Sequence, residues 1–203
     1  MRWIVWVVLV SVVVMLPGLV CGAGVLNEPE FNSPVTGKDA TDLAMHVIQS
    51  LIPCYEIRLK VLRNEEICAA AGISYREATE MILNDLTALY VLRYAKASAR
   101  LVQGENPVVE ITLRTPDPLD AFRVAIDHYK WNSKTMETSS GAILRDDEIF
   151  ESLDYGFTST KVRKIDVVFP VAVVVKEEGI TTRDSVGDLS IALPKAIERA
   201  LDL

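Results

Sequence analysis

The apolar positions in the first hundred residues recur mostly at helical spacing. The pattern over residues 43–51 predicts a helix that begins near Asp39 or Thr41 and stops at Pro53. A second pattern predicts a long central helix over residues 75–102. Its apolar stripe is formed by Leu83, Leu86, Tyr90, Tyr94, Ala97 and Leu101.

Residues 55–61 fit two different periods. Apolar and charged side chains alternate along this segment, which predicts a half-buried strand. A helix that runs through Pro53 is the alternative. An apolar row at helical spacing would then join Leu51, Tyr55 and Leu59. We take the strand as the prediction.

A turn between two helices is expected around Gly72. A short helix over Asn64–Ala71 would end there, and Ser74 and Glu77 form a capping box for the helix that follows. The stretch from Glu66 to Met81 resembles a helix-turn-helix in its glycine turn and apolar positions. Its recognition face would not be net positive, so we interpret it as a tight turn between packed helices.

Strand-like alternation dominates the C-terminal half. Residues 109–113 predict one strand, and residues 161–176 carry the strongest strand pattern of the chain. Within the latter, Pro170 implies a bulge or a sheet edge. Asp117 is expected to cap a helix. The other expected elements are that helix (119–131), a loop (132–141), a short helix (145–153), a hairpin return (180–182) and a last helix that starts at Pro194.

This order of elements predicts an α+β fold. An N-terminal helical part with one long central helix is followed by a mixed strand-helix-strand part with a small, antiparallel-rich sheet. We divide the chain into an N-terminal segment (1–23), a polar linker (24–41), a mainly helical subdomain (42–104) and an α+β subdomain (105–203). The pattern leaves open whether the last two form a single domain.

Residues 1–23 have the pattern of an export signal. Arg2 precedes a stretch without any charge, followed by a Pro-Gly break and a small-residue cleavage site. A cleaved signal peptide is the prediction. An uncleaved anchor that spans the membrane through residues 3–20 and a lipidated Cys21 are the alternatives. No Asn-x-Ser/Thr acceptor occurs, which favours a bacterial envelope. We therefore expect a periplasmic or secreted protein, or one anchored in the inner membrane.

Charge narrows the choice of partners. The chain has 203 residues and a formal net charge of -7. An acidic chain repels phosphate backbones, and the basic residues are scattered, so nucleic acid is not an expected partner. Other envelope proteins are the expected partners.

The two cysteines beyond the N-terminal segment suggest a disulfide. Outside the cytoplasm, Cys54 and Cys68 are expected to be oxidised and to close a loop of about 15 residues, worth roughly 3 kcal/mol. Two separate buried thiols are the alternative. A metal site is not expected, because neither a histidine nor a third cysteine lies nearby at ligand spacing.

Motifs for catalysis are missing from the sequence. It has no Gly-x-Ser-x-Gly, no His-Glu-x-x-His and no glycine-rich phosphate loop. We therefore expect no cofactor and no catalysis. A hydrolase that uses Asp146, Glu148 or Asp154 is one alternative, and a small-ligand or lipid-binding domain is another.

Three aromatic residues are candidates for binding a partner. Phe150, Tyr155 and Phe157 lie on either side of Gly156, and core packing is the alternative role for them. The predicted function is a non-catalytic, protein-binding or structural component of an envelope or secretion-type assembly.

Overall fold

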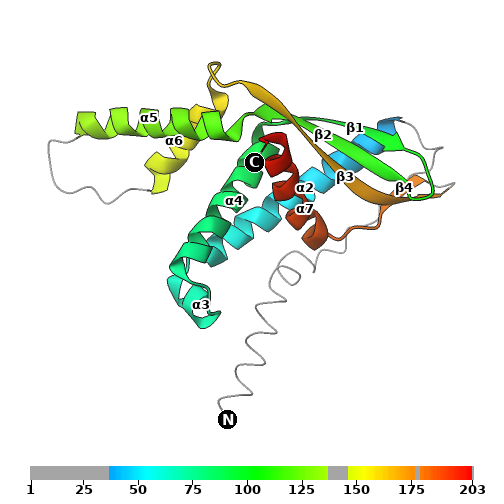
Figure 1. Ribbon diagram of the computed structural model, residues 1–203, viewed down its shortest axis with the longest axis horizontal. Helices are drawn as coiled ribbons and strands as arrows, with labels where there is room; N and C mark the ends of the chain where they lie inside the picture. Colours follow the sequence, from blue (N-terminus) through cyan, green and yellow to red (C-terminus); the bar gives the residue numbers. More distant parts are fainter. Residues whose placement is uncertain (1–36, 137–145, 177–178, 203) are drawn as a thin grey trace, which may run out of the picture.

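The computed structural model describes residues 37–136, 146–176 and 179–202; for residues 37, 38, 130–136 and 146–149 it describes the backbone alone. It contains a four-stranded antiparallel sheet, in the order β1-β2-β3-β4, and helices packed against it (Figure 1). The predicted α+β class is confirmed. In chain order the elements are α2 (Gly37–Leu62), α3 (Glu65–Ala70), α4 (Tyr75–Tyr94), β1 (Lys96–Val102), β2 (Val108–Pro116), α5 (Pro118–Met136), α6 (Asp146–Thr158), β3 (Lys164–Lys176), β4 (Gly179–Thr182) and α7 (Val186–Ala200).

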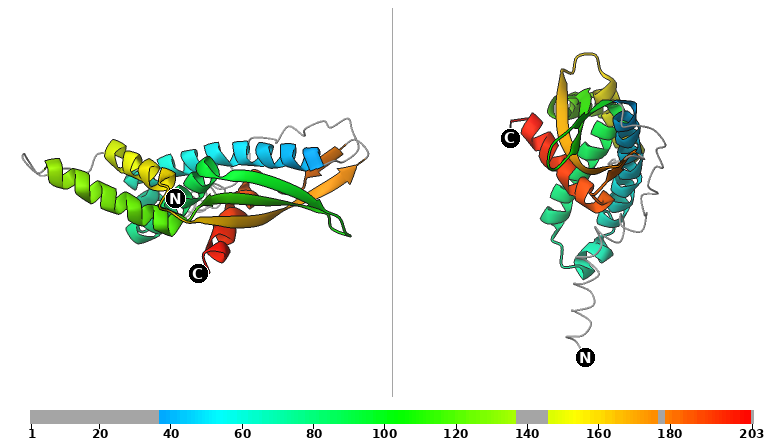
Figure 2. Two further views of the ribbon diagram at one scale, coloured as in Figure 1. Left: turned by 90° about the horizontal axis from the view of Figure 1, so that it is seen from above. Right: turned by 90° about the vertical axis from the view of Figure 1, so that its right-hand side faces the viewer.

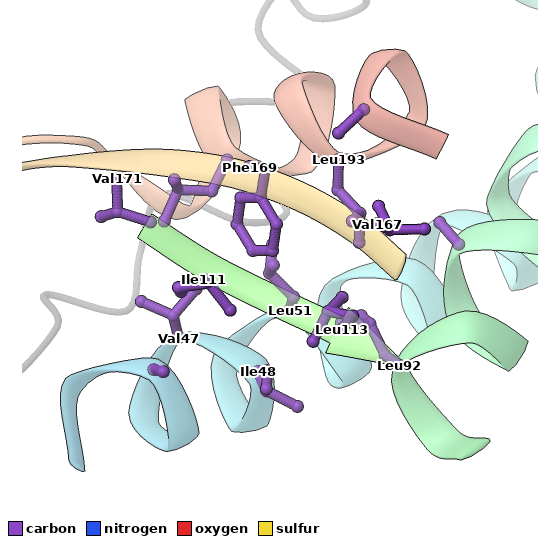
Figure 3. Close-up of a cluster of buried hydrophobic side chains, with 14 of the residues drawn as sticks. Val47, Ile48, Leu51, Leu92, Ile111, Leu113, Val167, Phe169, Val171 and Leu193 are labelled. Carbon is purple, nitrogen blue, oxygen red and sulfur yellow. The ribbon is translucent and has the colours of Figure 1, made fainter. Parts of the chain in front are cut away.

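The main core lies between the sheet and the helices α2, α4 and α7. Alternate residues of β2 and β3 point to the same side and meet apolar side chains from all three helices (Figure 3). Members of this core come from both halves of the chain, and the labelled ones are Val47, Ile48, Leu51, Leu92, Ile111, Leu113, Val167, Phe169, Val171 and Leu193. We call the sheet together with these three helices the body.

A pair of helices projects from one end of the body. α5 and α6 pack mainly on each other and extend away from the sheet (Figures 1 and 2). We call this pair the arm. A separate small core joins it to α4 and is formed by Tyr90, Ala121, Ala125, Leu153, Phe157 and Val162.

The strand predicted over residues 55–61 is wrong, because α2 continues through Pro53 to Leu62. The helical row is the one that is buried, since Leu51, Tyr55 and Leu59 all lie in the main core. A proline inside a helix removes one hydrogen bond. The burial of this row offsets that loss, and the alternation over the segment was a by-product of the helical period.

The long central helix is shorter than predicted. α4 ends at Tyr94, and residues 96–102 form β1, which pairs with β2 from Lys96↔Arg114 to Val102↔Val108. Residues 97 and 101 fit a helix and a strand equally well, because a spacing of four residues returns to the same side in both. The sheet partner decides, since β2 supplies a complete ladder to this segment.

Pro170 and Pro194 occupy positions where tertiary contacts compensate for the missing N–H or where no strand hydrogen bond to β2 is lost. Pro194 lies inside α7 rather than at its start. The carbonyl that its missing N–H leaves free belongs to Ser190, and this oxygen accepts a hydrogen bond from Tyr55 Oη at 2.8 Å. Pro170 lies in β3 without a bulge. The N–H of Ala172 donates to Asp184 and its carbonyl accepts from Arg183, both on the side away from β2. Because hydrogen-bonding directions repeat every two residues along a strand, the nitrogen of Pro170 also points away from β2.

Several local predictions are confirmed. The short helix expected over Asn64–Ala71 is present as α3, with Asn64 as its cap, Gly72 adopts a φ of +73°, and the Ser74–Glu77 capping box begins α4. β4 is the predicted hairpin return. The arm helices are longer than expected, because α5 continues to Met136 and α6 to Thr158.

The predicted bridge between Cys54 and Cys68 is not formed. Cys68 is a free, buried thiol whose Sγ donates to the carbonyl of Leu62 at 3.3 Å. Cys54 is disulfide-bonded, and its partner lies outside the described residues. The two cysteines belong to different clusters. Leu62, which Cys68 contacts, is eight residues of helix from Cys54, or about 12 Å along the axis. This separation keeps the two sulfur atoms apart.

Candidate functional site

The arm contains all three aromatic residues that the sequence proposes for partner binding, but only Phe150 and Phe157 share a cluster. Phe157 is buried against the rings of Tyr90 and Phe122, with centroids 5.0 and 5.7 Å away. Phe150, two turns earlier on the same side of α6, lies 4.9 Å from the guanidinium of Arg63. Tyr155 points elsewhere and is 49% exposed. Of the three, Tyr155 is therefore the one most open to a partner.

Tyr155 is held in place by a side chain from the other arm helix. Its ring stacks on that of His128 in α5, with centroids 4.0 Å apart and planes at 18°. His128 Nδ1 also lies 3.4 Å from Ser152 Oγ. The sequence could not reveal this group, because α5 and α6 meet only in the folded chain.

The His128–Ser152 pair does not make a nucleophilic centre. Ser152 is buried in the middle of α6, and its separation from the imidazole is longer than a good hydrogen bond. Backbone N–H groups in a helix interior are already bonded, so none is free to stabilise an oxyanion. We interpret the pair as a contact that orients His128 beneath Tyr155.

The two arm helices approach each other closely at Gly156. A Cβ atom at this position would lie 2.2 Å from the carbonyl oxygen of Ala121 and 3.1 Å from Ala125 Cβ. The small residues at positions 121, 125 and 156 therefore set the distance between α5 and α6. They fix the side of α5 that faces its partner helix, and hence the side that faces solvent.

A buried aspartate fastens the base of the arm. Asp117 Oδ1 accepts the N–H of Leu119 at 2.9 Å, which confirms the predicted cap of α5. Its Oδ2 accepts Arg163 Nε at 2.5 Å, and its own N–H donates to the carbonyl of Arg163 at 2.8 Å. Because Asp117 precedes α5 and Arg163 follows α6, the two ends of the arm are tied together.

The carboxylates considered for hydrolysis give no paired site in the described part of the chain. Asp154 accepts a hydrogen bond from Tyr94 Oη at 2.6 Å. Burial and this carboxylate together raise the pKa of Tyr94 to about 12. The side chains of Asp146 and Glu148 lie outside the described residues. No group of three or more potential metal ligands occurs among the described side chains.

A second polar cluster lies inside the body where α2, α4 and α7 meet. Asp85 in α4 is 1% exposed, and its Oδ1 forms an ion pair with Arg58 Nη2 at 2.9 Å. Apart from this ion pair, neither oxygen of the Asp85 carboxylate has a hydrogen-bond partner among the described residues. Burial raises the pKa of Asp85 to about 6 against the opposing effect of Arg58. Arg58 also donates to Ser190 Oγ at 3.2 Å.

This cluster has the character of a structural junction. Tyr55 Oη and Arg58 both reach Ser190, so α2 holds α7 through two side chains and α4 through one ion pair. Burial raises the pKa of Tyr55, so its hydroxyl remains a donor over the ordinary pH range. No local sequence pattern indicates this junction, because its members come from three separate helices.

Comparison with protein families, with curated proteins and with solved structures found no match to this chain. Among the described residues, no helix combines the length with the apolar composition that a membrane span requires. The predicted export segment, residues 1–23, and most of the linker lie outside the described residues. A functional proposal therefore depends on the surfaces of the body and the arm.

Proposed function

We propose that this chain is an exported bacterial envelope protein without catalytic function that binds other proteins as part of an envelope or secretion-type assembly. The observation that carries the proposal is the arm, which projects from the body (Figure 1). It presents large apolar side chains to solvent. The exposed ones are Leu119 and Ile126 on α5 and Tyr155 on α6.

The exposed residues of α5 lie on a consistent side of that helix. At about 100° per residue, Leu119 and Ile126 are roughly 20° apart, and both lie about 100–160° around the helix from Ala121 and Ala125, which pack on α6. Apolar side chains exposed on one stripe of a projecting helix suit docking into a partner groove. The charge-free N-terminal pattern supports export, which would place such partners in the envelope.

Site-specific cross-linking in the source organism tests the proposal. A photoreactive amino acid replaces Ile126 or Tyr155 in the full-length chain, and Ile191, which is exposed on α7, serves as the matched position on the body. We expect a discrete adduct with another envelope protein from the arm positions and none from Ile191.

A companion variant separates docking from chance proximity. Leu119→Ala together with Ile126→Ala should reduce the adduct formed through Tyr155, while Ile57→Ala, an exposed residue of α2, should leave it unchanged. Arm positions that yield no protein adduct, in a chain shown to be folded, would contradict the proposal. Intact mass of the mature protein tests export separately, since cleavage after Gly22 or Ala23 is expected.

A further inference from the structure

The cysteines of the chain differ in their chemical state. The sequence contains three of them, Cys21, Cys54 and Cys68. Cys68 is a free thiol, whereas Cys54 is disulfide-bonded. A disulfide within one chain needs two cysteines, and only Cys21 is left to pair with Cys54. The partner of Cys54 therefore follows by elimination from two described residues and the sequence.

The surroundings of Cys54 favour a partner in the same chain. Cys54 belongs to the main core and is 3% exposed. A disulfide to a second molecule requires a sulfur atom that the other molecule can reach, and a residue this deeply buried does not offer one. Cys68 is held in a separate small cluster, where its Sγ donates to the carbonyl of Leu62.

The chain before α2 is long enough to make this bond. The described residues begin at Gly37, and Cys54 lies about 25 Å from that point along the axis of α2. The residues between Cys21 and Gly37 reach about 50 Å when fully extended. The connection is therefore about twice as long as the path back to Cys54, and the pairing requires no strain.

Cys21 directly follows the apolar stretch of the N-terminal segment. No charged residue occurs between Trp3 and Leu26, so the stretch has the length of about 20 residues that a membrane span needs. The expected cleavage after Gly22 or Ala23 lies beyond Cys21. Hydrolysis of that peptide bond would leave the N-terminal segment attached to α2 through sulfur.

We propose that a disulfide between Cys21 and Cys54 fastens the apolar N-terminal segment to the body and holds α2 next to the membrane. A flexible linker of the length found here spans roughly 20–25 Å on average, whereas the Cα atoms of a disulfide are about 6 Å apart. The bond would also use the thiol that lipidation of Cys21 needs. The inference rests on the export part of the proposed function and concerns attachment, not partner binding.

Formation of this bond is a two-electron oxidation. One of the two thiolates attacks the disulfide of an oxidised thiol–disulfide oxidoreductase of the envelope, and the second then displaces that protein from the mixed disulfide. The chain loses two electrons and two protons, and the oxidoreductase is reduced to its dithiol form. Because the cytoplasm keeps thiols reduced, the bond should form only after export.

Counting thiols before and after reduction gives a direct test. The full-length chain is isolated from the source organism after an acid quench and alkylated in denaturant. We expect alkylation of Cys68 alone before reduction and of all three cysteines afterwards. Peptide mass spectrometry should show positions 21 and 54 linked. Cys68→Ser is the matched control and should keep this link, whereas Cys21→Ser should make Cys54 reactive.

Energy transfer tests the position of the body. A fluorescent amino acid replaces Gln49, an exposed residue of α2, and the full-length chain is placed in vesicles with an acceptor on the lipid headgroups. We expect transfer about twofold lower in Cys21→Ser, and the same loss after reduction of the natural chain, because the linker then sets the distance. Cys68→Ser should give the transfer of the natural chain.

Several results would overturn the inference. These are a link between Cys54 and Cys68, a disulfide-bonded dimer, and equal energy transfer in the natural chain and Cys21→Ser. An exported chain that has lost residues 1–23 and has two reactive thiols would reject this attachment alone. A full-length chain in the cytosol with three reduced cysteines would reject the proposed export as well.

Discussion

The body and the arm are stabilised in different ways. The body buries aliphatic side chains from segments as distant in the chain as α2 and α7, whereas the arm consists of two neighbouring helices around a small core rich in aromatic rings. Contacts with α4 and the Asp117–Arg163 pair hold the arm to the body. A unit with few long-range contacts can open locally without global unfolding. The projecting element is therefore also the one best able to adjust to a partner.

Their buried aspartates show the same contrast. At the base of the arm, both oxygens of Asp117 accept hydrogen bonds. In the body, Asp85 has an ion pair to one oxygen and no described partner for the other. The body can contain an incompletely satisfied carboxylate because its large apolar core offsets the cost. The small core of the arm buries too little apolar surface to offset the same cost.

The largest expected effect is in the core of the body. Leu193 is fully buried between α7 and the sheet, so Leu193→Ala should lower the free energy of unfolding by about 2–5 kcal/mol. Ile191→Ala, two residues earlier and exposed, should change it by less than about 0.5 kcal/mol. Urea denaturation of the purified protein measures both. Similar values for the two variants would mean that α7 does not pack on the sheet as described.

A smaller effect, dependent on pH, is expected at Asp85. Its pKa of about 6 in the folded protein lies above its usual 3.8, so the folded chain retains a proton that the unfolded chain has lost. Stability should therefore fall as pH rises from about 4 to 6, by at most about 3 kcal/mol. Asp85→Asn should remove this part of the pH dependence.

Asp154→Asn provides the control for that measurement, because Asp154 is exposed on the arm. The free energy of unfolding is compared on the two sides of the pH window for the natural chain and both variants. If Asp85→Asn kept the full dependence and Asp154→Asn lost it, the buried junction would not be the titrating element.

The smallest effect should be confined to the arm. Gly156→Ala places a methyl group against the backbone of Ala121, and overpacking of this kind costs about 1–3 kcal/mol. Amide hydrogen exchange should accelerate in α5 and α6 and remain unchanged in the sheet. Gly104→Ala, in the β1–β2 turn, meets no atom within 4 Å and is the control. Acceleration throughout the body would show that the arm and body unfold as one unit.

Signals that act within one turn or one strand were predictable. The Ser74–Glu77 capping box, the Gly72 turn and the Asp117 cap each depend on residues a few positions apart, and all three are present. The candidate site was only partly predictable. The aromatic residues of α6 were predicted as candidates, but His128, which stacks on Tyr155, comes from α5 and has no local sequence pattern.

By itself, the sequence determined the α+β class, the long strand β3 and the local caps, because these follow from hydrophobic period and short-range hydrogen bonding. Only the tertiary structure decided that residues 96–102 form a strand, that helices continue through Pro53 and Pro194, and that Cys68 remains a free thiol. The strand depends on pairing with the neighbouring β2, the two helices depend on contacts with distant segments, and the free thiol depends on the separation of two packed clusters. The hydroxyl of Tyr55 that completes the hydrogen bonding of α7 comes from 135 residues away.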